Sequence, residues 1–496
     1  MEPTQKLETI VTESPVIPAP EGPVSPTGIT LKQYLILVAS GAFVTTFAQQ
    51  RVLGNLPTTL LLKDHLHLPK DQIAFFFFWA TFAWSIKPIA GIFTDAFPIF
   101  GTRRRHYMLL GTGMAGLLWF VMMFCDNSFI ALLIVSAFMN GATVFASTVM
   151  GGLMVEAGQV YNAPGRISSL RQFVQSVAGI GGPLVGGFLA GKAFGWQATT
   201  GIAGGAAISL SILTWMYLRE KPIYRNGSQT EDVLDRPVYR IPIFMIIGLA
   251  TVFVLATYLF SIKEVRSVGI SLYALLATFG LILGIVFAPT RNNVIIKAQW
   301  QLVSILQSRT LWMAVTMLFL VYTVPGMNTA LVFQQTDVIH LSPTIIGRYT
   351  SLEGVLGVIG AGLYALFCRK LNLRILLIGG IGINAIVTLG FLLYNAGTAP
   401  FIHSASGFVT VISELALMDL AVRSTPRGCE ALGFALMMSV RNFGIAVSDI
   451  IGTKMMEQFH FSFNKLVVIN ASTTLLVLLF VPFLPRLVMS RKEGEV

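Results

Sequence analysis

Charged residues are scarce in this chain. Asp, Glu, Lys and Arg make up 11% of its 496 residues, whereas a soluble domain carries about 25%. Cysteine is rare too: the chain has three, Cys125, Cys368 and Cys429, without metal-ligand spacing, so we expect no disulfide framework and no metal site. A Gly-x-x-x-x-Gly-Lys-Ser/Thr phosphate loop is absent, which argues against ATP hydrolysis. These absences disfavour a soluble domain and an ATP-driven pump, and we expect no cofactor.

Long apolar segments fill most of the chain instead. Apolar residues make up 54% of it, and a membrane-spanning helix needs about 20 of them in succession. The pattern predicts an all-α polytopic membrane protein with about 14 spans. They cover 33–62, 72–98, 106–125, 128–157, 167–191, 197–218, 240–262, 268–288, 310–335, 343–368, 373–394, 401–422, 428–457 and 464–489.

An internal repeat groups these spans. Asp64-His-Leu-His-Leu68 before Ile73 matches Asp337-Val-Ile-His-Leu341 before Ile346, at a constant offset of 273 residues. Such parallel repeats build many secondary transporters. We therefore predict a tail at 1–32, a six-helix bundle at 33–218, a linker at 219–239, two additional helices at 240–288, a linker at 289–309, a second six-helix bundle at 310–489 and a tail at 490–496.

The basic residues sort by side of the membrane. The net charge is +11, and with a cytoplasmic N-terminus the loops predicted inside are all basic, for example 103–105, 219–240, 369–374 and 486–492. Loops predicted outside carry few Lys or Arg. This positive-inside pattern predicts a multi-pass protein of the cell membrane with both termini cytoplasmic. The positive net charge is therefore explained by the orientation of the chain in the lipid bilayer. We do not expect nucleic acid as a partner.

The loop after the second span carries a motif. Gly91-x-x-x-Asp95 is followed by Gly101-x-Arg103-Arg104-Arg105, which is similar to the signature loop of the major facilitator superfamily. Asp95 stands where a helix leaves the membrane and can pair with the basic loop or cap a helix N-terminus. We predict a gate at Asp95 and the three arginines; the alternative is that the arginines only fix orientation.

A wider set of blocks narrows the family. These are Leu62-Lys-Asp-His-Leu-His-Leu-Pro69, Trp84-Ser-Ile-Lys-Pro88, Thr94-Asp-Ala-Phe-Pro-Ile-Phe-Gly101 and Gly428-Cys-Glu-Ala-Leu432 leading into Phe434-Ala-Leu-Met-Met-Ser439. Together they resemble the folate–biopterin transporter family. The resemblance implies the major facilitator fold and uptake of folates or pterins, often with protons. The fourth span keeps the family's ending as Met154-Val155-Glu156, and Glu156 is grouped with the gate. Ser147 and Gly151 replace acidic residues expected there.

Six ionisable residues fall near the middle of predicted spans: Arg51, Lys87, Glu353, Glu414, Arg441 and Asp449. Each costs roughly 2.5–3.5 kcal/mol or more in the bilayer, so each needs a reason. Lys87 precedes Pro88, which bends a helix, and we assign it to the gate with helix packing as the alternative. The cluster of Phe75 to Phe78 is expected to face lipid.

Substrate-binding candidates surround Arg51. Its planar fork suits a carboxylate or phosphate, and one helical turn separates it from Asn55; an ion pair between helices is the alternative. Pro325-Gly326 is expected to break its helix and free carbonyl groups toward a cavity. The full predicted set is Gln49, Gln50, Arg51, Asn55, Asn328, Gln334 and Arg441.

Proton coupling is assigned to carboxylates, because a buried carboxylate can load and release a proton near neutral pH. Glu414 is the first choice, followed by Glu353 and Asp449. The competing interpretation is that these carboxylates neutralise Arg441.

We therefore predict a secondary transporter that works by alternating access, with protons and a folate-like or pterin-like organic anion as partners. The alternatives are an exporter of drugs or metabolites and a non-transporting assembly or pigment-delivery factor on the same fold. An enzyme is not expected, since Asp64, His65 and His67 form the nearest match to a reactive cluster and part of it recurs at the repeat position.

Overall fold

The computed structural model describes residues 31–96, 99–102, 104–160, 164–220, 300–301, 303–368, 370–426 and 429–490. All regular structure in these ranges is helical, apart from one isolated bridge between Ile99 and Thr102. The predicted additional helices at 240–262 and 268–288 lie outside the described residues. So do the tail before residue 31 and most of both linkers.

The first half is a group of helices in chain order. Its elements are α1 (Leu31–Phe47), α2 (Asn55–Leu60), the π-helix η1 (Leu61–His65), α3 (Lys70–Thr81), the 3₁₀ helix η2 (Phe82–Ile86), α4 (Lys87–Ala96), α5 (Arg105–Met122), α6 (Phe129–Val160), α7 (Pro164–Ala190) and α8 (Gly195–Tyr217).

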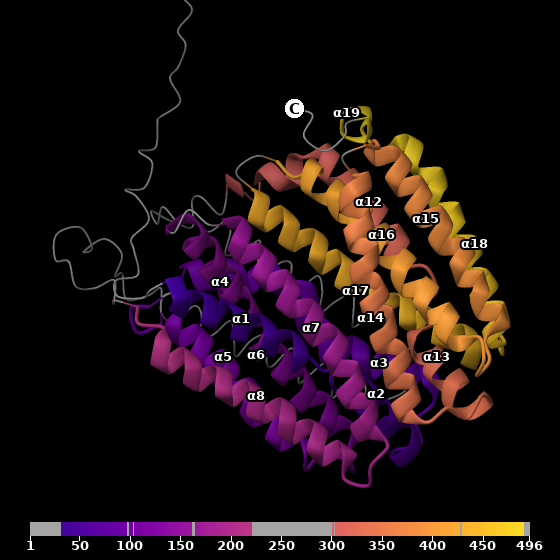
Figure 1. Cartoon of the computed structure of the whole chain (residues 1–496), viewed down its shortest axis with the longest axis horizontal. Helices are drawn as coiled ribbons and strands as arrows, with labels where there is room; N and C mark the ends of the chain where they lie inside the picture. Colours follow the sequence, from indigo (N-terminus) through magenta and orange to yellow (C-terminus); the bar gives the residue numbers. More distant parts are fainter. Residues whose placement is uncertain are drawn as a thin grey trace, which may run out of the picture.

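The second half begins with the same order of elements. It consists of α12 (Arg309–Tyr322), α13 (Asn328–Phe333), the π-helix η6 (Gln334–Val338), α14 (Pro343–Phe367), α15 (Leu373–Leu389), the 3₁₀ helix η7 (Gly390–Leu393), α16 (Ala399–Ser424), α17 (Glu430–Glu457), α18 (Phe463–Val477), the 3₁₀ helix η8 (Leu478–Phe483) and α19 (Arg486–Met489). Figure 1 shows the two halves side by side, the first in indigo to magenta and the second in orange to yellow.

Around the sequence match, the repeat holds residue by residue in the backbone. α2 and α13 begin at Asn55 and Asn328, which are 273 positions apart, and both run into a five-residue π-helix. His67 and His340 keep the same offset and both have a positive φ, 52° and 57°. The short sequence match therefore marks a repeat of backbone structure in this segment.

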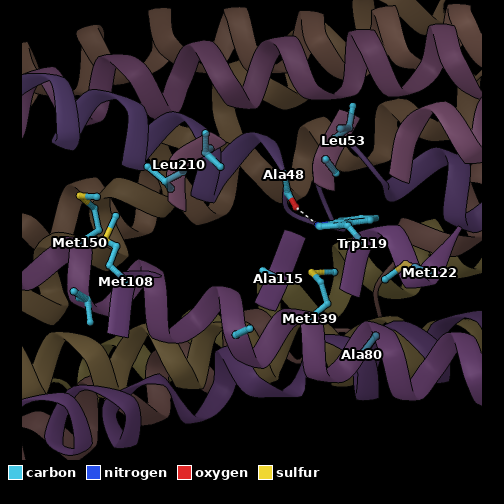
Figure 2. Packing of buried hydrophobic residues seen from close by; sticks show 14 of the residues in the cluster. Ala48, Leu53, Ala80, Met108, Ala115, Trp119, Met122, Met139, Met150 and Leu210 are labelled. Carbon is cyan, nitrogen blue, oxygen red and sulfur yellow. Dashed lines mark hydrogen bonds between the residues drawn. The ribbon is translucent and has the colours of Figure 1, made fainter. Parts of the chain in front are cut away.

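The predicted continuous helix over 33–62 is wrong, because the structure interrupts it between Phe47 and Asn55. Pro57 lies in the first turn of α2, where its missing N–H breaks no helical hydrogen bond, whereas a helix continuing from α1 would lose one there. Figure 2 shows that Trp119 Nε1 donates to the carbonyl oxygen of Ala48, at 3.2 Å, so a group freed by the break keeps a partner. The indole is 1% exposed.

The same break occurs in the second half. The predicted helix over 310–335 ends at Tyr322 and resumes at Asn328, so Pro325-Gly326 interrupts it as expected. The second span changes to a 3₁₀ turn at Phe82–Ile86, directly before Lys87-Pro88 at the start of α4.

Two helix pairs make the most extensive contacts between the halves. α7 packs along α14, and Ser351 Oγ donates to the carbonyl oxygen of Ile180 at 2.8 Å. A Cβ added to Gly347 would lie 2.5 Å from the carbonyl oxygen of Pro183, so the two backbones touch here only because Gly347 has no side chain. α17 packs along α3, where the rings of Phe78 and Phe443 are 5.9 Å apart.

The outer surface suits a bilayer. Within the described chain, seven helices are long and apolar enough to cross a membrane, and large apolar side chains such as Leu117, Ile386 and Leu479 are more than 60% exposed. The expectation for the phenylalanine cluster is wrong for Phe76, Phe77 and Phe78, which are at most 5% exposed. They pack inward because α3 lies between α6 and α17.

Candidate functional site between the two halves

A cavity of about 920 Å³ lies between the halves and is lined by residues of both. Its charged lining residues are Arg51, Lys87, Arg171, Glu353, Glu414 and Arg441. Five of the six mid-membrane charges predicted from the sequence therefore meet in one place. Asp449 is the exception, because its side chain is 0% exposed and does not line the cavity.

Arg51 lies in the break before α2 rather than within a helix. Its Cζ is 4.2 Å from the centroid of the Phe77 ring, an arrangement that stabilises a guanidinium. No described carboxylate forms an ion pair with it, although Asp449 attracts it from a longer distance. Gln49 and Asn55 line the same wall. Arg51 is therefore held by an aromatic ring with its charge left for the cavity.

Gln50 lies behind this wall. Its Nε2 donates to Ser136 Oγ at 3.0 Å, its Oε1 accepts from Asn140 Nδ2 at 3.0 Å, and it is 0% exposed. Asn140 Oδ1 also accepts from Trp84 Nε1 at 3.0 Å. The predicted contact of Gln50 with a solute therefore has no geometric support, and the amide instead ties the break in the first span to α6.

Lys87 reaches the cavity beside the altered position of the fourth span. Its Nζ donates to Ser147 Oγ at 3.0 Å and lies 5.4 Å from the Trp84 ring centroid. A serine hydroxyl does not neutralise the ammonium group. Arg171 is near enough to repel it electrostatically. This side of the cavity is therefore strongly cationic.

Arg441 and Glu414 form the opposite wall. Arg441 Nη2 lies 2.6 Å from Glu414 Oε1, and Arg441 Nε donates to the Tyr322 hydroxyl at 3.3 Å. The interpretation that Glu414 neutralises Arg441 thus has direct geometric support. Glu353 makes no contact with Arg441.

Glu353 belongs to a second polar cluster. His403 Nδ1 lies 2.5 Å from Glu353 Oε1, and His403 Nε2 lies 2.7 Å from the Tyr394 hydroxyl. Gln335 Nε2 donates to the same hydroxyl at 2.7 Å. Tyr349 stacks on the imidazole, with centroids 5.5 Å apart.

Asp449 has a structural partner. Its Oδ1 accepts from the Thr329 amide at 2.9 Å and its Oδ2 accepts from Thr329 Oγ1 at 2.7 Å. The carboxylate thus satisfies a free amide in the first turn of α13, where negative charge is favoured. Asn328 lines the cavity beside it.

Two expectations for the broken second-half helix need correction. The freed carbonyl of Pro325 does not face the cavity but accepts from Asn470 Nδ2 at 2.7 Å, on α18. Gln335 lines the cavity in place of the predicted Gln334, because the π-helix that starts at residue 334 turns its side chains differently from an α-helix.

Contacts between the repeats lie beside one end of the cavity. Lys63 Nζ forms an ion pair with Asp337 and donates to Thr336 Oγ1 at 2.9 Å. Lys70 Nζ pairs with Glu457 at 2.9 Å. Both ammonium groups also lie over the Phe333 ring, at 5.2 and 4.8 Å. The two halves are therefore tied together at the loops that contain the repeat.

The predicted gate lies near the C-terminal end of α6, which forms the fourth span. The backbone amides of Arg104 and Arg105 donate to Glu220 Oε2 at 3.0 and 2.9 Å. The side chains of Asp95 and Glu156, and the whole of Arg103, lie outside the described residues. The predicted pairing of Asp95 with the arginines therefore stays a prediction.

Sequence reasoning missed Arg171 and His403 as cavity residues. Arg171 lies near the start of the predicted span 167–191, and Gln172 and Gln175 beside it are a signal that polar side chains enter this span. His403 stands alone in an apolar stretch, and its partners are 50 or more positions away, so no local pattern identifies it.

Comparisons with known proteins agree on one family and one fold. The family model of the BT1 family matches residues 50–495. The folate-biopterin transporter of Synechocystis sp. is 24% identical over 460 residues, covering 89% of this chain and 80% of that protein. Folate transporter 1 of Plasmodium falciparum is 20% identical over 466 residues, covering 90% and 79%.

Solved structures give the fold. A D-xylose–proton symporter matches with a TM-score of 0.60 at 13% identity, covering 92% of this chain and 98% of that chain. A peptide transporter, POT, in complex with sulfate matches with a TM-score of 0.62 at 15% identity, covering 92% and 96%. The predicted major facilitator fold is confirmed; the predicted number of 14 spans is not settled by these matches.

Proposed function

Since this chain belongs to the BT1 family and is a multi-pass membrane transporter of the major facilitator type, we propose that it moves a folate-like or pterin-like organic anion together with protons. It does so by alternating access, with the two halves rocking about the cavity between them. The proposed binding residues are Arg51, Asn55 and Asn328, joined by Lys87 and Arg171.

The charge of the cavity carries this proposal. Four basic side chains and two carboxylates line it. Glu414 is already paired with Arg441, so Arg51, Lys87 and Arg171 keep their charge for a ligand. A guanidinium binds a planar carboxylate with two parallel hydrogen bonds. An anionic solute would be complementary in charge to these side chains.

The size of the cavity fits an organic solute. Ligand sites for drug-sized molecules occupy about 300–1,000 Å³, and this cavity of about 920 Å³ is at the upper end. Trp84 lies on its lining and offers a ring face for a flat heterocycle. A pterin ring with a carboxylate-bearing tail matches both features.

The contacts at Lys63 and Lys70 support an alternating mechanism. They join the halves at the loops predicted to face outward, so this arrangement is a state closed on that side. Opening would require both ion pairs to separate.

We place the protein in the cell membrane with both termini cytoplasmic, and we assign the residues between the two bundles to two additional helices.

Uptake into proteoliposomes tests the proposal. We expect radiolabelled folate or biopterin to accumulate under an inward proton gradient, and the accumulation to disappear when a protonophore collapses the gradient. Accumulation that is unaffected by the protonophore would contradict proton coupling. No uptake of either compound by correctly inserted protein would contradict the substrate class and favour an assembly factor or a carrier of another solute.

A further inference from the structure

The cluster around His403 has no role in the binding wall described above. It joins Glu353 of α14, His403 of α16, Tyr394 after η7 and Gln335 of η6. His403 is 2% exposed, whereas the Glu353 side chain is 30% exposed and lines the cavity. Both residues line the cavity, and the carboxylate is the more exposed of the two.

The hydrogen bonds favour one tautomer of His403. Gln335 Nε2 donates to the Tyr394 hydroxyl oxygen, so the Tyr394 O–H is free to donate to His403 Nε2, 2.7 Å away. Nε2 is then an acceptor, and the imidazole carries its proton on Nδ1, which donates to Glu353 Oε1. A doubly protonated imidazole would turn an N–H toward the Gln335 amide nitrogen, 3.2 Å from Nε2.

We propose that Glu353 is the carboxylate that binds the transported proton, and that His403 is the positioning residue that holds it at the cavity wall. This inference rests on the proposed proton coupling and chooses between its two cavity carboxylates. The proton arrives from cavity water and forms an O–H bond at Glu353 Oε2, while Oε1 keeps its hydrogen bond from His403 Nδ1. Release to water on the other side reverses the step.

Glu414 is the poorer choice for a physical reason. Its partner Arg441 is a permanent cation, so protonating Glu414 would leave an unpaired guanidinium inside the membrane, which is costly. The neighbour of Glu353 is a neutral imidazole in this tautomer. Protonating Glu353 therefore removes one charge from the cavity wall and leaves no other charge unpaired.

The surroundings of His403 contain no competing charge among the described residues. The titratable groups that face it are Glu353 and Tyr349 from α14 and Tyr394 from the segment after η7. Gln335 is the contact from η6. The residues directly after Gln335 are Thr336 and Asp337, which receive Lys63, so the cluster touches the turn beside one end of the cavity.

Infrared difference spectroscopy of the protein in lipid vesicles tests the assignment without any substrate. We expect a carbonyl-stretch band of a protonated carboxyl group to appear as the pH is lowered. It should be lost in Glu353→Gln and kept in Glu414→Gln. A band that survives in Glu353→Gln, or that is lost in Glu414→Gln, would overturn the proposal. If Glu353→Gln cannot be purified, the band in Glu414→Gln decides. Loss of the band in that variant would overturn the proposal, and a retained band would support it.

His403 is tested by the pH profile of the same band. His403→Leu removes the donor to Glu353, and we expect the midpoint of the titration to shift by about one pH unit or more. His403→Asn places an amide N–H near the position of Nδ1–H and should restore at least half of the shift. An unchanged midpoint in His403→Leu would overturn the positioning role.

Transport measurements separate this inference from the proposed function. With tritiated folate as the probe, Glu353→Gln should lose gradient-driven accumulation but keep exchange of internal for external folate at equal pH. Full accumulation in Glu353→Gln would overturn the inference alone. No folate transport by the wild-type protein, with the band present and lost in Glu353→Gln, would overturn the proposed substrate and leave the proton site supported.

Discussion

Lys63 and Thr336 occupy equivalent positions of the two repeats, 273 residues apart, and Lys63 Nζ donates to Thr336 Oγ1 at 2.9 Å. The same ammonium group pairs with Asp337. The pseudo-symmetry of the chain therefore brings the first helix of each half to a common point. A contact at such a point can hold two rocking halves together with very few residues.

The first prediction concerns this contact. Removing both ion pairs with Lys63→Met and Lys70→Met should favour the state that is open on this side, because partly exposed pairs each contribute up to about 1 kcal/mol. We expect the open population to rise about fivefold or more. Spin labels at the exposed equivalent positions His65 and Val338 would report it as a longer distance by double electron–electron resonance. Lys192→Met, whose lysine lies over Phe188 within one half, is the control.

Close packing of α7 on α14 gives a second prediction. Gly347→Leu should force the helices apart, because a Cβ at this position already meets the carbonyl oxygen of Pro183 at 2.5 Å. Amide hydrogen exchange over residues 180–190 should become faster. Gly362→Leu lies on the same helix with open space around its Cβ and should leave the exchange unchanged. Equal rates in the two variants would show that the contact does not hold this interface.

The Arg441–Glu414 pair should behave as a unit. Arg441→Gln leaves Glu414 unpaired, and we expect a loss of about 2 kcal/mol in the free energy of unfolding, less than the roughly 3–5 kcal/mol of a fully buried pair. Combining it with Glu414→Gln should recover most of this loss. Unfolding by SDS titration of both single variants and the double variant measures the coupling. Additive effects would mean that the pair contributes nothing.

Asp449 should act as a helix cap and not in coupling. Asp449→Ala leaves the amide and hydroxyl of Thr329 without their acceptor, at a cost of about 2 kcal/mol. Asp449→Asn keeps one acceptor oxygen and should retain proton-driven folate uptake with an unchanged pH profile. Loss of gradient-driven uptake in a well-folded Asp449→Asn protein would restore the coupling role predicted from the sequence.

The architecture could be predicted from the sequence because its signals are local. Apolar segments, basic loops and the repeat can each be recognised within a short stretch of chain. The five-residue match of Asp64 to Leu68 with Asp337 to Leu341 located a structural repeat that keeps its offset at helix starts and at both histidines of positive φ. Pro325-Gly326 likewise predicted a break in its helix. These features depend on local backbone chemistry, which a single sequence displays.

Side-chain destinations were harder to predict, because they depend on which helix lies opposite. Gln50 and Asp449 are polar residues of the right depth, but each is bonded to a neighbouring element away from the cavity. The sequence predicted Gln334 rather than Gln335 as a substrate-binding residue, because it gave no sign of the π-helix. His403 became visible only when α14, α16 and η6 were brought together.

Binding of tritiated folate to purified wild-type protein and Arg51→Gln tests most directly that the cavity holds an organic anion. Losing a charge-assisted hydrogen bond costs about 1.5–3 kcal/mol, so we predict a Kd about 10-fold to 100-fold higher in Arg51→Gln. Arg51→Lys keeps the charge without the fork and should fall between the two. An unchanged Kd in a folded Arg51→Gln protein, or no saturable binding by the wild type, would contradict the account.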